Sequence, residues 1–349
     1  MIVAVTISTP GARATAVEVP PVAFSSRPLR ACLRKRPKFQ CRRGSGPAAR
    51  AGPEGEARMR ELRRRHTPLS VARWASRKAA RAMSAWPGIR HVHYAFHRWE
   101  FLAGRNDSGY SGLFSSVEDA ARSAPIAVTG YDQAGMADLD VYSHASGEFR
   151  PMPPTEYPAL FWLRPAIEGG ARHLFDLGGY VGHVYYQYCG YLDFPDGFSW
   201  TIYDVPNITQ AGERIARERG DRHLNFTNDI GAIGEADIVF AAGSLQYLKE
   251  GFLHEALRGA SRLPPHLIIH RTALHPTRSF VTLQSINQRS GRIAFCPYTV
   301  AHRERFIKDL EALGYEQVDA WTKQRAIDVP LHPECHADTY SGLYFRLRN

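Results

Sequence analysis

The sequence has no long hydrophobic run. None of its 349 residues lies in a stretch of 18 or more consecutive apolar residues, the length at which a membrane-spanning helix becomes a candidate. The apolar run at residues 1–7 has no basic residues before it and is soon followed by Pro10, which is not the pattern of a secretory signal. We therefore expect neither a membrane span nor a secretory signal.

Cysteine is also scarce. The five cysteines are far apart, odd in number and without a CxxC pair: Cys32, Cys41, Cys189, Cys296 and Cys335. This spacing is typical of reduced thiols rather than of a disulfide framework, so it favours a cytoplasmic protein. The run HPECH at residues 332–336 is a single short polar stretch and cannot alone supply a tetrahedral site, so we expect no metal.

Acidic residues are rare at the N-terminus. Residues 1–100 contain 21 Lys and Arg against 5 Asp and Glu, whereas residues 101–349 contain 23 against 29. The formal net charge of +10 is thus concentrated in the first hundred residues, and the remainder is mildly acidic. This distribution counts against a nucleic-acid groove as the main function of the folded part.

The length allows two domains of roughly 150 residues, or one large domain with appendages. Residues 9–67 are rich in Arg, Pro, Gly, Ala and Ser and show no helical or strand period, so we expect residues 1–67 to be a disordered basic extension. Three explanations stay open: a tail that contacts RNA or anionic lipid, an organelle-targeting arm, and an upstream extension included by an early start codon, with the true start near Met59.

Residues 68–160 are expected to form a small helical and aromatic cap. A basic segment at 68–84 has helical spacing, and an aromatic run follows at 91–102. Ser115 and Glu118 have the spacing of a capping box, so residues 110–115 are expected to lead into a helix. The proline-rich run at 149–158 is typical of a linker, and we place the next domain at residues 161–349.

Beyond residue 165, strands and helices alternate, as in an α/β parallel sheet. The apolar strand RHLFDL at 172–177 runs into the glycine turn GGYVG at 178–182, and a helix is expected from 181 to 192. Glycines let the backbone approach a ligand, and a helix N-terminus offers free N–H groups. This order of elements predicts a nucleotide-type site.

Two acidic residues bear on which nucleotide is bound. Asp176 lies two residues before the first glycine, where a carboxylate would repel a pyrophosphate but attract an ammonium. S-adenosylmethionine (SAM) presents an α-amino group and a sulfonium at this place, so the pattern suits it better than NAD. Asp204 ends the second strand, 199–203, and is suited to accept hydrogen bonds from ribose hydroxyls of either cofactor.

These motifs resemble those of a known family. The order FDLGGYVG (175–182), YDVP (203–206), FTND (226–229) and ADIVFAAGSLQYL (236–248) is similar to class I SAM-dependent methyltransferases. It is most similar to bacterial putative methyltransferases of undefined substrate, and more distantly to plant-type small-molecule O-methyltransferases. The resemblance covers about residues 110–349. It implies a cofactor site made by Asp176, Gly178, Gly179, Gly182, Asp204, Val205, Asn228, Asp229, Gly243 and Ser244.

Within that site the resemblance implies a division of roles. The glycine turn and Asp176 would surround the methionine part of the cofactor, and Asp204 would bind the ribose. Asn228 or Asp229 would lie near the adenine, after a third strand at 224–227. From the residues alone, Asp204 is equally suited to be a helix N-cap before 207–219, and Asp229 to be a loop cap.

The remaining elements fit the same fold. We expect strands at 236–242, 266–271, 315–321 and 339–347, and helices at 251–262 and 298–313. Together they predict a Rossmann-like α/β sheet of seven strands, mostly parallel, with an antiparallel last strand. Ligands are expected beyond the carboxyl ends of its strands.

Catalytic candidates lie near the ends of the fourth and fifth strands. His270 is a candidate general base because its ordinary pKa is near working pH; a histidine satisfied by its surroundings is the alternative. Gln246 and Gln284 are candidates to orient an acceptor, and Arg271 to bind an acidic one. The His-Asp pair of the plant-type enzymes is missing after the fourth strand, and residues 275–299 are expected to be a loop beside the acceptor.

The sequence therefore predicts SAM-dependent methyl transfer to a small molecule, such as a sugar or a carrier-linked biosynthetic intermediate. An NAD-dependent oxidoreductase and a non-catalytic scaffold with the same fold are the alternatives. Nucleic acid is not expected as a partner, and the oligomeric state is not predicted.

Overall fold

The computed structural model describes residues 87–103, 109–124, 152–287 and 293–348. The expected basic extension at 1–67 and the basic helix at 68–84 lie outside the described residues. The described segments fall in one compact unit.

Five parallel strands make up most of the main sheet and include one of its two edges. They are β2 (His173–Leu177), β3 (Ser199–Tyr203), β4 (Leu224–Thr227), β5 (Ile238–Ala242) and β6 (His266–Thr272). Parallel strands are covered on both faces and therefore appear in a sequence as short apolar runs. The expected positions of these strands are confirmed to within two residues.

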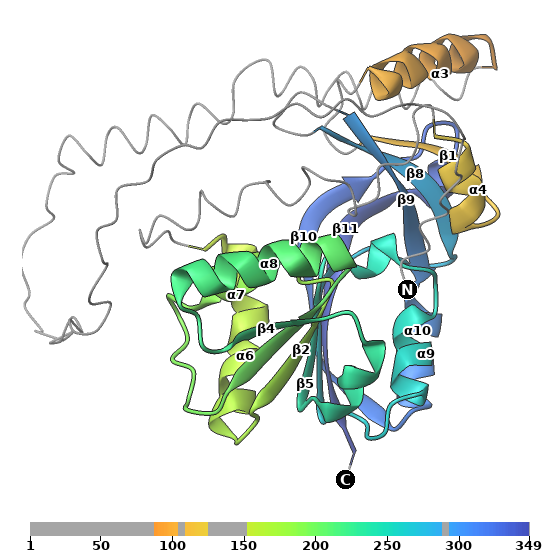
Figure 1. Cartoon of the computed structure of the whole chain (residues 1–349). Coiled ribbons are helices and arrows are strands. Elements are labelled where there is room, and N and C mark those ends of the chain that lie inside the picture. The colour runs from red at the N-terminus through yellow and green to blue at the C-terminus, as the bar shows by residue number, and fades with distance from the viewer. Residues whose placement is uncertain (1–86, 104–108, 125–151, 288–292, 349) are drawn as a thin grey trace, which may run out of the picture. The chain divides into compact units, whose positions relative to one another are not determined.

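The last two strands complete the sheet (Figure 1). Strand β11 (Ala337–Leu347) pairs antiparallel with β6, and β10 (Tyr315–Ile327) pairs antiparallel with β11. The strand order is β10-β11-β6-β5-β2-β3-β4. The predicted fold class, a mostly parallel seven-stranded sheet with an antiparallel last strand, is confirmed.

Helices cover both faces of this sheet (Figure 1). One face packs against α6 (Tyr157–Glu168), α7 (His183–Tyr188) and α8 (Pro206–Arg219) around buried Trp200 and Phe240. The other packs against η2 (Ile230–Glu235), α9 (Phe252–Arg258) and α10 (Arg303–Glu311) around Val239 and Leu267. Helix α6 extends across residue 160, where the sequence analysis placed a domain boundary.

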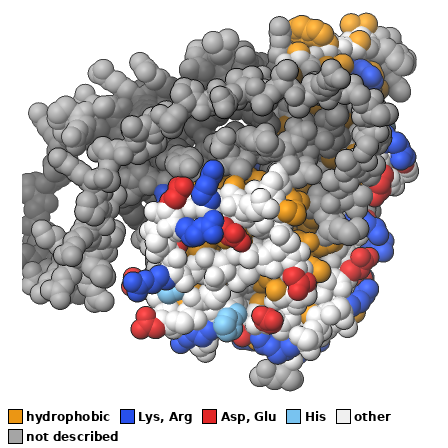
Figure 2. Space-filling view, in the orientation of Figure 1, with side chains coloured by type: hydrophobic (Ala, Val, Ile, Leu, Met, Phe, Trp, Pro, Cys, Tyr) orange, Lys and Arg blue, Asp and Glu red, His pale blue; other side chains and the backbone are white. Residues whose placement is uncertain are grey.

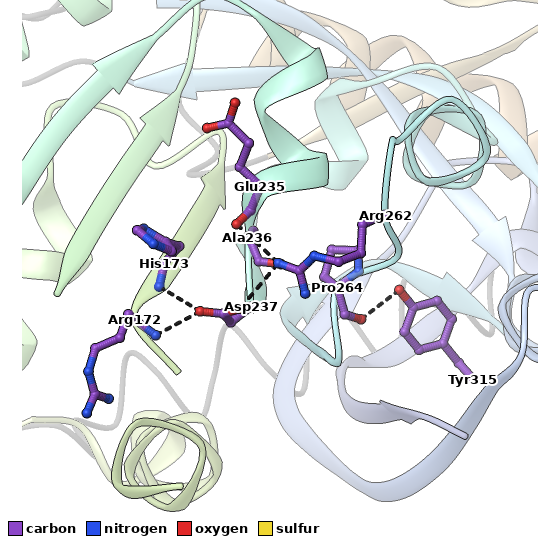
Figure 3. Close-up of polar contacts among 8 residues, drawn as sticks. All are labelled: Arg172, His173, Glu235, Ala236, Asp237, Arg262, Pro264 and Tyr315. Carbon is purple, nitrogen blue, oxygen red and sulfur yellow. Dashed lines mark hydrogen bonds and ion pairs between the residues drawn. The ribbon is translucent and has the colours of Figure 1, made fainter. Parts of the chain in front are cut away.

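At the amino ends of the strands, Asp237 joins three segments of the chain (Figure 3). Its Oδ2 accepts hydrogen bonds from the backbone N–H groups of Arg172 (2.8 Å) and His173 (3.0 Å), and its Oδ1 lies 3.3 Å from the Arg262 guanidinium. Arg262 also donates to the carbonyls of Glu235 and Ala236, while the Tyr315 hydroxyl donates to Pro264 O. This edge, opposite the expected ligand site, is therefore held by side-chain to backbone hydrogen bonds.

A second sheet corrects one expectation. Residues 275–299 are not a loop: they belong largely to β7 (Leu274–His275), β8 (Phe280–Asn287) and β9 (Ile293–His302), which join β1 (Tyr110–Phe114) in the order β1-β8-β9-β7. The expected helix at 298–313 also begins later, at Arg303. Tyr298, Thr299 and Val300 are aromatic and β-branched residues, and they pair with β8 as a strand.

The N-terminal described segment differs from expectation in detail. Helix α3 (Pro87–Leu102) contains the aromatic run, and residues 110–114 lead into a helix as expected but are themselves a strand. The cap of α4 (Val117–Arg122) is Ser116, whose hydroxyl accepts the Asp119 N–H, and not Ser115. Phe101 of α3 packs with Leu283 and Phe295 of the second sheet.

The charges on the visible face are mixed. In Figure 2, basic and acidic side chains are interspersed over the described residues rather than gathered by sign.

Among the described residues, no helix is long and apolar enough to cross a membrane.

Candidate functional site

The glycine turn after β2 has the backbone that its sequence predicts. Gly178 and Gly182 have positive φ angles of 73° and 96°, which favour glycine, and Tyr180 between them has a φ of 58°. The Gly178 N–H donates to Tyr203 O at 2.8 Å, which fixes the turn to the end of β3. A non-glycine residue at positive φ is uncommon and often marks a functional turn.

The turn also packs closely on two predicted site residues. A Cβ placed on Gly179 would lie less than 3.0 Å from Asp176 Oδ2, and one on Gly178 less than 3.0 Å from the Ser244 side chain. Ser244 Oγ donates to Leu177 O, at the end of β2. The structure therefore brings Asp176, Gly178, Gly179 and Ser244 together, although they come from two strand ends separated by more than sixty residues.

Asp176 is a buried carboxylate that lacks one partner. Its side chain is 1% exposed, and Oδ2 accepts a hydrogen bond from Trp200 Nε1 at 3.0 Å. Oδ1 has no hydrogen-bond partner among the described residues. Burial raises the pKa of Asp176 to about 7, and the charge of Asp204 adds to this effect. A ligand cation at this place would stabilise the ionised carboxylate.

Asp204 holds the glycine turn from the neighbouring strand. Its Oδ2 accepts the Tyr180 N–H at 3.0 Å and its Oδ1 accepts the Val205 N–H at 2.8 Å. The N-cap of α8 is Val205, so Asp204 does not cap that helix. Burial raises the pKa of Asp204 to about 6, and the two backbone hydrogen bonds oppose the rise. Each oxygen keeps a second lone pair for a ligand hydroxyl.

Asn228 and Asp229 have partners within the protein. Asn228 Nδ2 donates to Asp204 O at 2.7 Å and to Thr209 Oγ1 at 3.0 Å, and so joins the end of β4 to the end of β3. Asp229 accepts the Gly231 N–H at 2.8 Å and caps η2. The alternative of a loop cap for Asp229 is therefore present, and a place near the adenine stays a prediction for both residues.

The segment after β5 meets the end of β6. Gly243, with a φ of 78°, donates its N–H to His270 O at 2.8 Å. Gln246, in η3 (Leu245–Tyr247), donates from Nε2 to Gly243 O at 2.8 Å, while its buried Oε1 has no partner among the described residues. Gln246 also lines a small cavity together with Thr272 and Thr299, whose hydroxyls are likewise unpaired.

His270 is fully buried and has both ring nitrogens paired. Trp321 Nε1 donates to His270 Nδ1 at 3.0 Å, and because an indole N–H is only a donor, Nδ1 must be the acceptor. His270 Nε2 then carries the proton and donates to Glu156 Oε2 at 3.0 Å. Burial lowers the pKa of His270, which favours the neutral ring. A general-base role at His270 stays a prediction that requires one of these bonds to break.

Glu156 is the residue of this cluster that sequence reasoning missed. It ends η1 (Pro154–Glu156), inside the run expected to be a linker, and is 2% exposed. Burial alone would raise its pKa, but the hydrogen bond from His270 and the nearby charges of Arg271 and Lys323 lower the pKa of Glu156 to about 2. No local pattern signals Glu156, because its partners are more than 100 residues away in the sequence.

Arg271 has an unusual backbone and one unpaired donor. Its φ is 56°, in the left-handed region that a non-glycine residue rarely adopts. The guanidinium donates from one terminal nitrogen to Ala242 O at 3.1 Å, and the other lies 3.6 Å from Glu156 Oε1. The buried Nε has no partner among the described residues.

A chain of hydroxyl and amide groups lies between η3 and the second sheet. The Tyr247 hydroxyl donates to Gln284 Oε1 at 3.0 Å, and Gln284 Nε2 is 3.5 Å from the Tyr110 hydroxyl. The Tyr110 hydroxyl is in turn 2.9 Å from that of Tyr340, which also contacts the hydroxyl of Tyr298. Burial raises the pKa of Tyr110 and of Tyr298 far above the ordinary value, so both stay protonated. Tyr110 and Tyr340 of this chain were not among the candidate site residues predicted from the sequence.

The two histidines of the HPECH segment lie beside carboxylates. His332 Nδ1 is 3.2 Å from Glu334 Oε1, and His336 Nε2 is 2.8 Å from Asp338 Oδ1. In the described part of the chain, no three His, Cys, Asp or Glu side chains are grouped as potential metal ligands.

Comparisons with known proteins concern the fold. No family model and no curated protein sequence matches the chain. Similar solved structures include a SAM-dependent methyltransferase from Clostridium acetobutylicum (10% identity, 59% of this chain and 95% of that chain, TM-score 0.40). Others are the CcbJ methyltransferase from Streptomyces caelestis (16%, 61% and 96%, 0.39) and the amino pentose methyltransferase CalS10 from Micromonospora echinaspora (14%, 59% and 94%, 0.35).

Proposed function

We propose that the protein transfers a methyl group from SAM to a small-molecule acceptor. The observation that carries this proposal is Asp176, a buried carboxylate with one unpaired oxygen beneath a glycine turn. A pyrophosphate over this turn would face a negative charge, whereas the α-ammonium of SAM would be attracted to it. The site thus favours a cationic cofactor over a dinucleotide.

Asp204 supports the same assignment. Its two oxygens are oriented by the N–H groups of Tyr180 and Val205, so its carboxylate is held at the end of β3, beside the turn. Paired ribose hydroxyls would be suitable donors to the remaining lone pairs. We assign the ribose to Asp204 and the methionine end of the cofactor to the turn of Gly178, Gly179 and Gly182 and to Gly243 and Ser244.

When bound, SAM supplies an activated methyl group on a sulfonium, so the protein's task is mainly to position the acceptor. We place the acceptor beside Gln246, Tyr247 and Gln284, whose amides and hydroxyl orient it by hydrogen bonds. An acceptor that bears a proton releases it to water or to a base during the transfer. A sugar or a carrier-linked intermediate is the acceptor class that we retain from the sequence resemblance. The cytoplasmic location rests on the cysteine pattern alone.

Calorimetric titration of the full-length chain with S-adenosylhomocysteine (SAH), and separately with NAD, tests the proposal. We expect saturable binding of SAH and no binding of NAD. Binding of NAD alone would establish the oxidoreductase alternative. A folded sample that binds neither ligand would contradict the proposal and favour the scaffold alternative.

A further inference from the structure

We propose that Arg271 binds the carboxylate at the amino-acid end of the cofactor, and that Glu156, held by His270, positions Arg271 for this contact. This inference rests on the proposed function. The sequence alone suggested that Arg271 binds an acidic acceptor. The inference gives Arg271 the carboxylate of the cofactor as its partner instead.

Two buried atoms of opposite charge lack partners at the same edge of the sheet. They are Asp176 Oδ1, an acceptor, and Arg271 Nε, a donor, and neither is paired among the described residues. Gly243 lies between their strands, since β5 pairs with both β2 and β6. A Cβ on Gly243 would be 3.7 Å from Arg271 Nε. The amino-acid end of SAM carries one ammonium and one carboxylate, and therefore matches both unpaired atoms.

The guanidinium of Arg271 is fixed by the protein on its other sides. One terminal nitrogen donates to Ala242 O at 3.1 Å, and the other faces Glu156 at 3.6 Å. The positive φ of 56° turns the backbone away from the regular strand at this residue. Strained backbone is retained where the surrounding structure and function require it. The Nε–H is thus a buried donor that the described residues leave unpaired.

Glu156 is held by a chain of hydrogen bonds that crosses the sheet. Trp321 of β10 reaches over β11 to His270 of β6, and it does so above Gly342, where a Cβ would lie less than 3.0 Å from the indole. This contact fixes the His270 tautomer that donates to Glu156. Because the pKa of Glu156 is lowered to about 2, its carboxylate is ionised and attracts Arg271.

Glu156 is shared by two cations. It contacts Lys323 at 3.4 Å as well as Arg271, while His270 is neutral. Asp176 is the other carboxylate whose charge interacts with Arg271. When a ligand ammonium pairs with Asp176, a ligand carboxylate would balance the charge of Arg271.

The test is calorimetric titration of the full-length protein with SAH and with decarboxylated SAH, which lacks only the carboxylate. For the wild type we expect the decarboxylated ligand to bind about 10- to 100-fold more weakly, the size of a charge-assisted hydrogen bond. In Arg271→Met, SAH should weaken to the same level, so that the affinity ratio of the two ligands falls to about 1. Arg271→Lys should restore part of the ratio.

Positioning by Glu156 is tested with two variants and a control. Glu156→Gln removes the charge that faces Arg271 and should reduce the ratio, as should Trp321→Phe, which removes the N–H donor but leaves an aromatic ring at this position. Lys308→Met removes a cation that pairs with Glu304 on α10 and not with Glu156, and it should leave the ratio unchanged. General damage to the fold would weaken both ligands equally and would not change the ratio.

The outcomes separate this inference from the proposed function. Failure of SAH to bind the folded wild type would overturn both. Equal affinity of the wild type for SAH and for decarboxylated SAH would overturn the inference alone. A ratio that persists in Arg271→Met would show that another residue binds the cofactor carboxylate, and would leave Arg271 for an acidic acceptor.

Discussion

The backbone of Gly179 lies directly on the carboxylate of Asp176. A Cβ at residue 179 would fall less than 3.0 Å from both Asp176 Oδ2 and Asp176 Cγ. Since Asp176 is buried beneath the turn and bonded to Trp200, it cannot move aside without losing that hydrogen bond. The turn and the carboxylate beneath it are therefore one structural unit.

We expect Gly179→Ala to weaken SAH binding at least about tenfold. The added methyl must displace the turn or Asp176, and overpacking of this kind typically costs about 1–3 kcal/mol. Calorimetry measures the affinity. Gly259→Ala is a suitable control, because its Cβ would meet no atom closer than 3.6 Å. Equal affinity in the two variants would exclude the turn from the cofactor site.

Asp176 should make the ligand-free protein less stable as the pH rises. Its pKa is about 7 when folded, against an ordinary value of 3.8. A raised carboxyl pKa contributes stability that is fully present below pH about 4 and is lost as the pH rises through 7. Between pH 5 and pH 8 the wild type should lose about 2 to 3 kcal/mol more than Asp176→Asn. Urea unfolding at both pH values measures the free energy of unfolding of the two proteins. Equal losses in the wild type and in Asp176→Asn would contradict the prediction.

The same residue should make SAH binding depend on pH. An ionised Asp176 attracts the ligand ammonium and a protonated one does not, so affinity should increase several-fold from pH 6 to pH 7.5. Asp204, with a pKa of about 6, titrates in the same range. The contribution of Asp176 is therefore the difference between the pH dependence of SAH affinity in the wild type and that in Asp176→Asn. A variant that keeps the full slope would assign the dependence to another group.

The main sheet was predictable because its strands are covered on both faces. β3 and β4 have the bounds expected from their apolar runs, and the turn between β2 and α7 was marked by its glycines. The acids at 176 and 204 follow from their places at strand ends. Each of these features is determined by a short stretch of the chain and could therefore be predicted from the local sequence.

The second sheet was not predictable because its buried strand β8 contains polar residues. In β8, Thr282 and Ser285 are fully buried together with Leu283 and Gln284, because both faces of this sheet are covered. Polar and apolar residues therefore do not alternate, and the strand has no period of two. The partners of His270 were missed because Glu156 and Trp321 approach it only in the folded chain.

Gly342→Ala should displace Trp321 from His270. The added Cβ would lie within 3.0 Å of the indole, which is packed against the strand and cannot keep its hydrogen bond. We expect a loss of about 1–3 kcal/mol in the free energy of unfolding and a change in tryptophan fluorescence. Gly259→Ala again serves as the control. Unchanged stability and fluorescence would show that the Trp321 indole can adopt another position without loss.

At the opposite edge, Asp237→Ala should reduce stability without affecting the cofactor. It leaves the N–H groups of Arg172 and His173 unpaired, which we expect to cost about 2 kcal/mol. Burial alone would raise the pKa of Asp237, but these hydrogen bonds and Arg262 lower it. Its contribution is therefore present above the ordinary pKa and is lost as the pH falls through the lowered one, so the difference from the wild type should narrow in acid. Urea unfolding across pH, with SAH titration at neutral pH, measures both effects. A changed SAH affinity in the folded variant would mean that the two edges of the sheet are coupled.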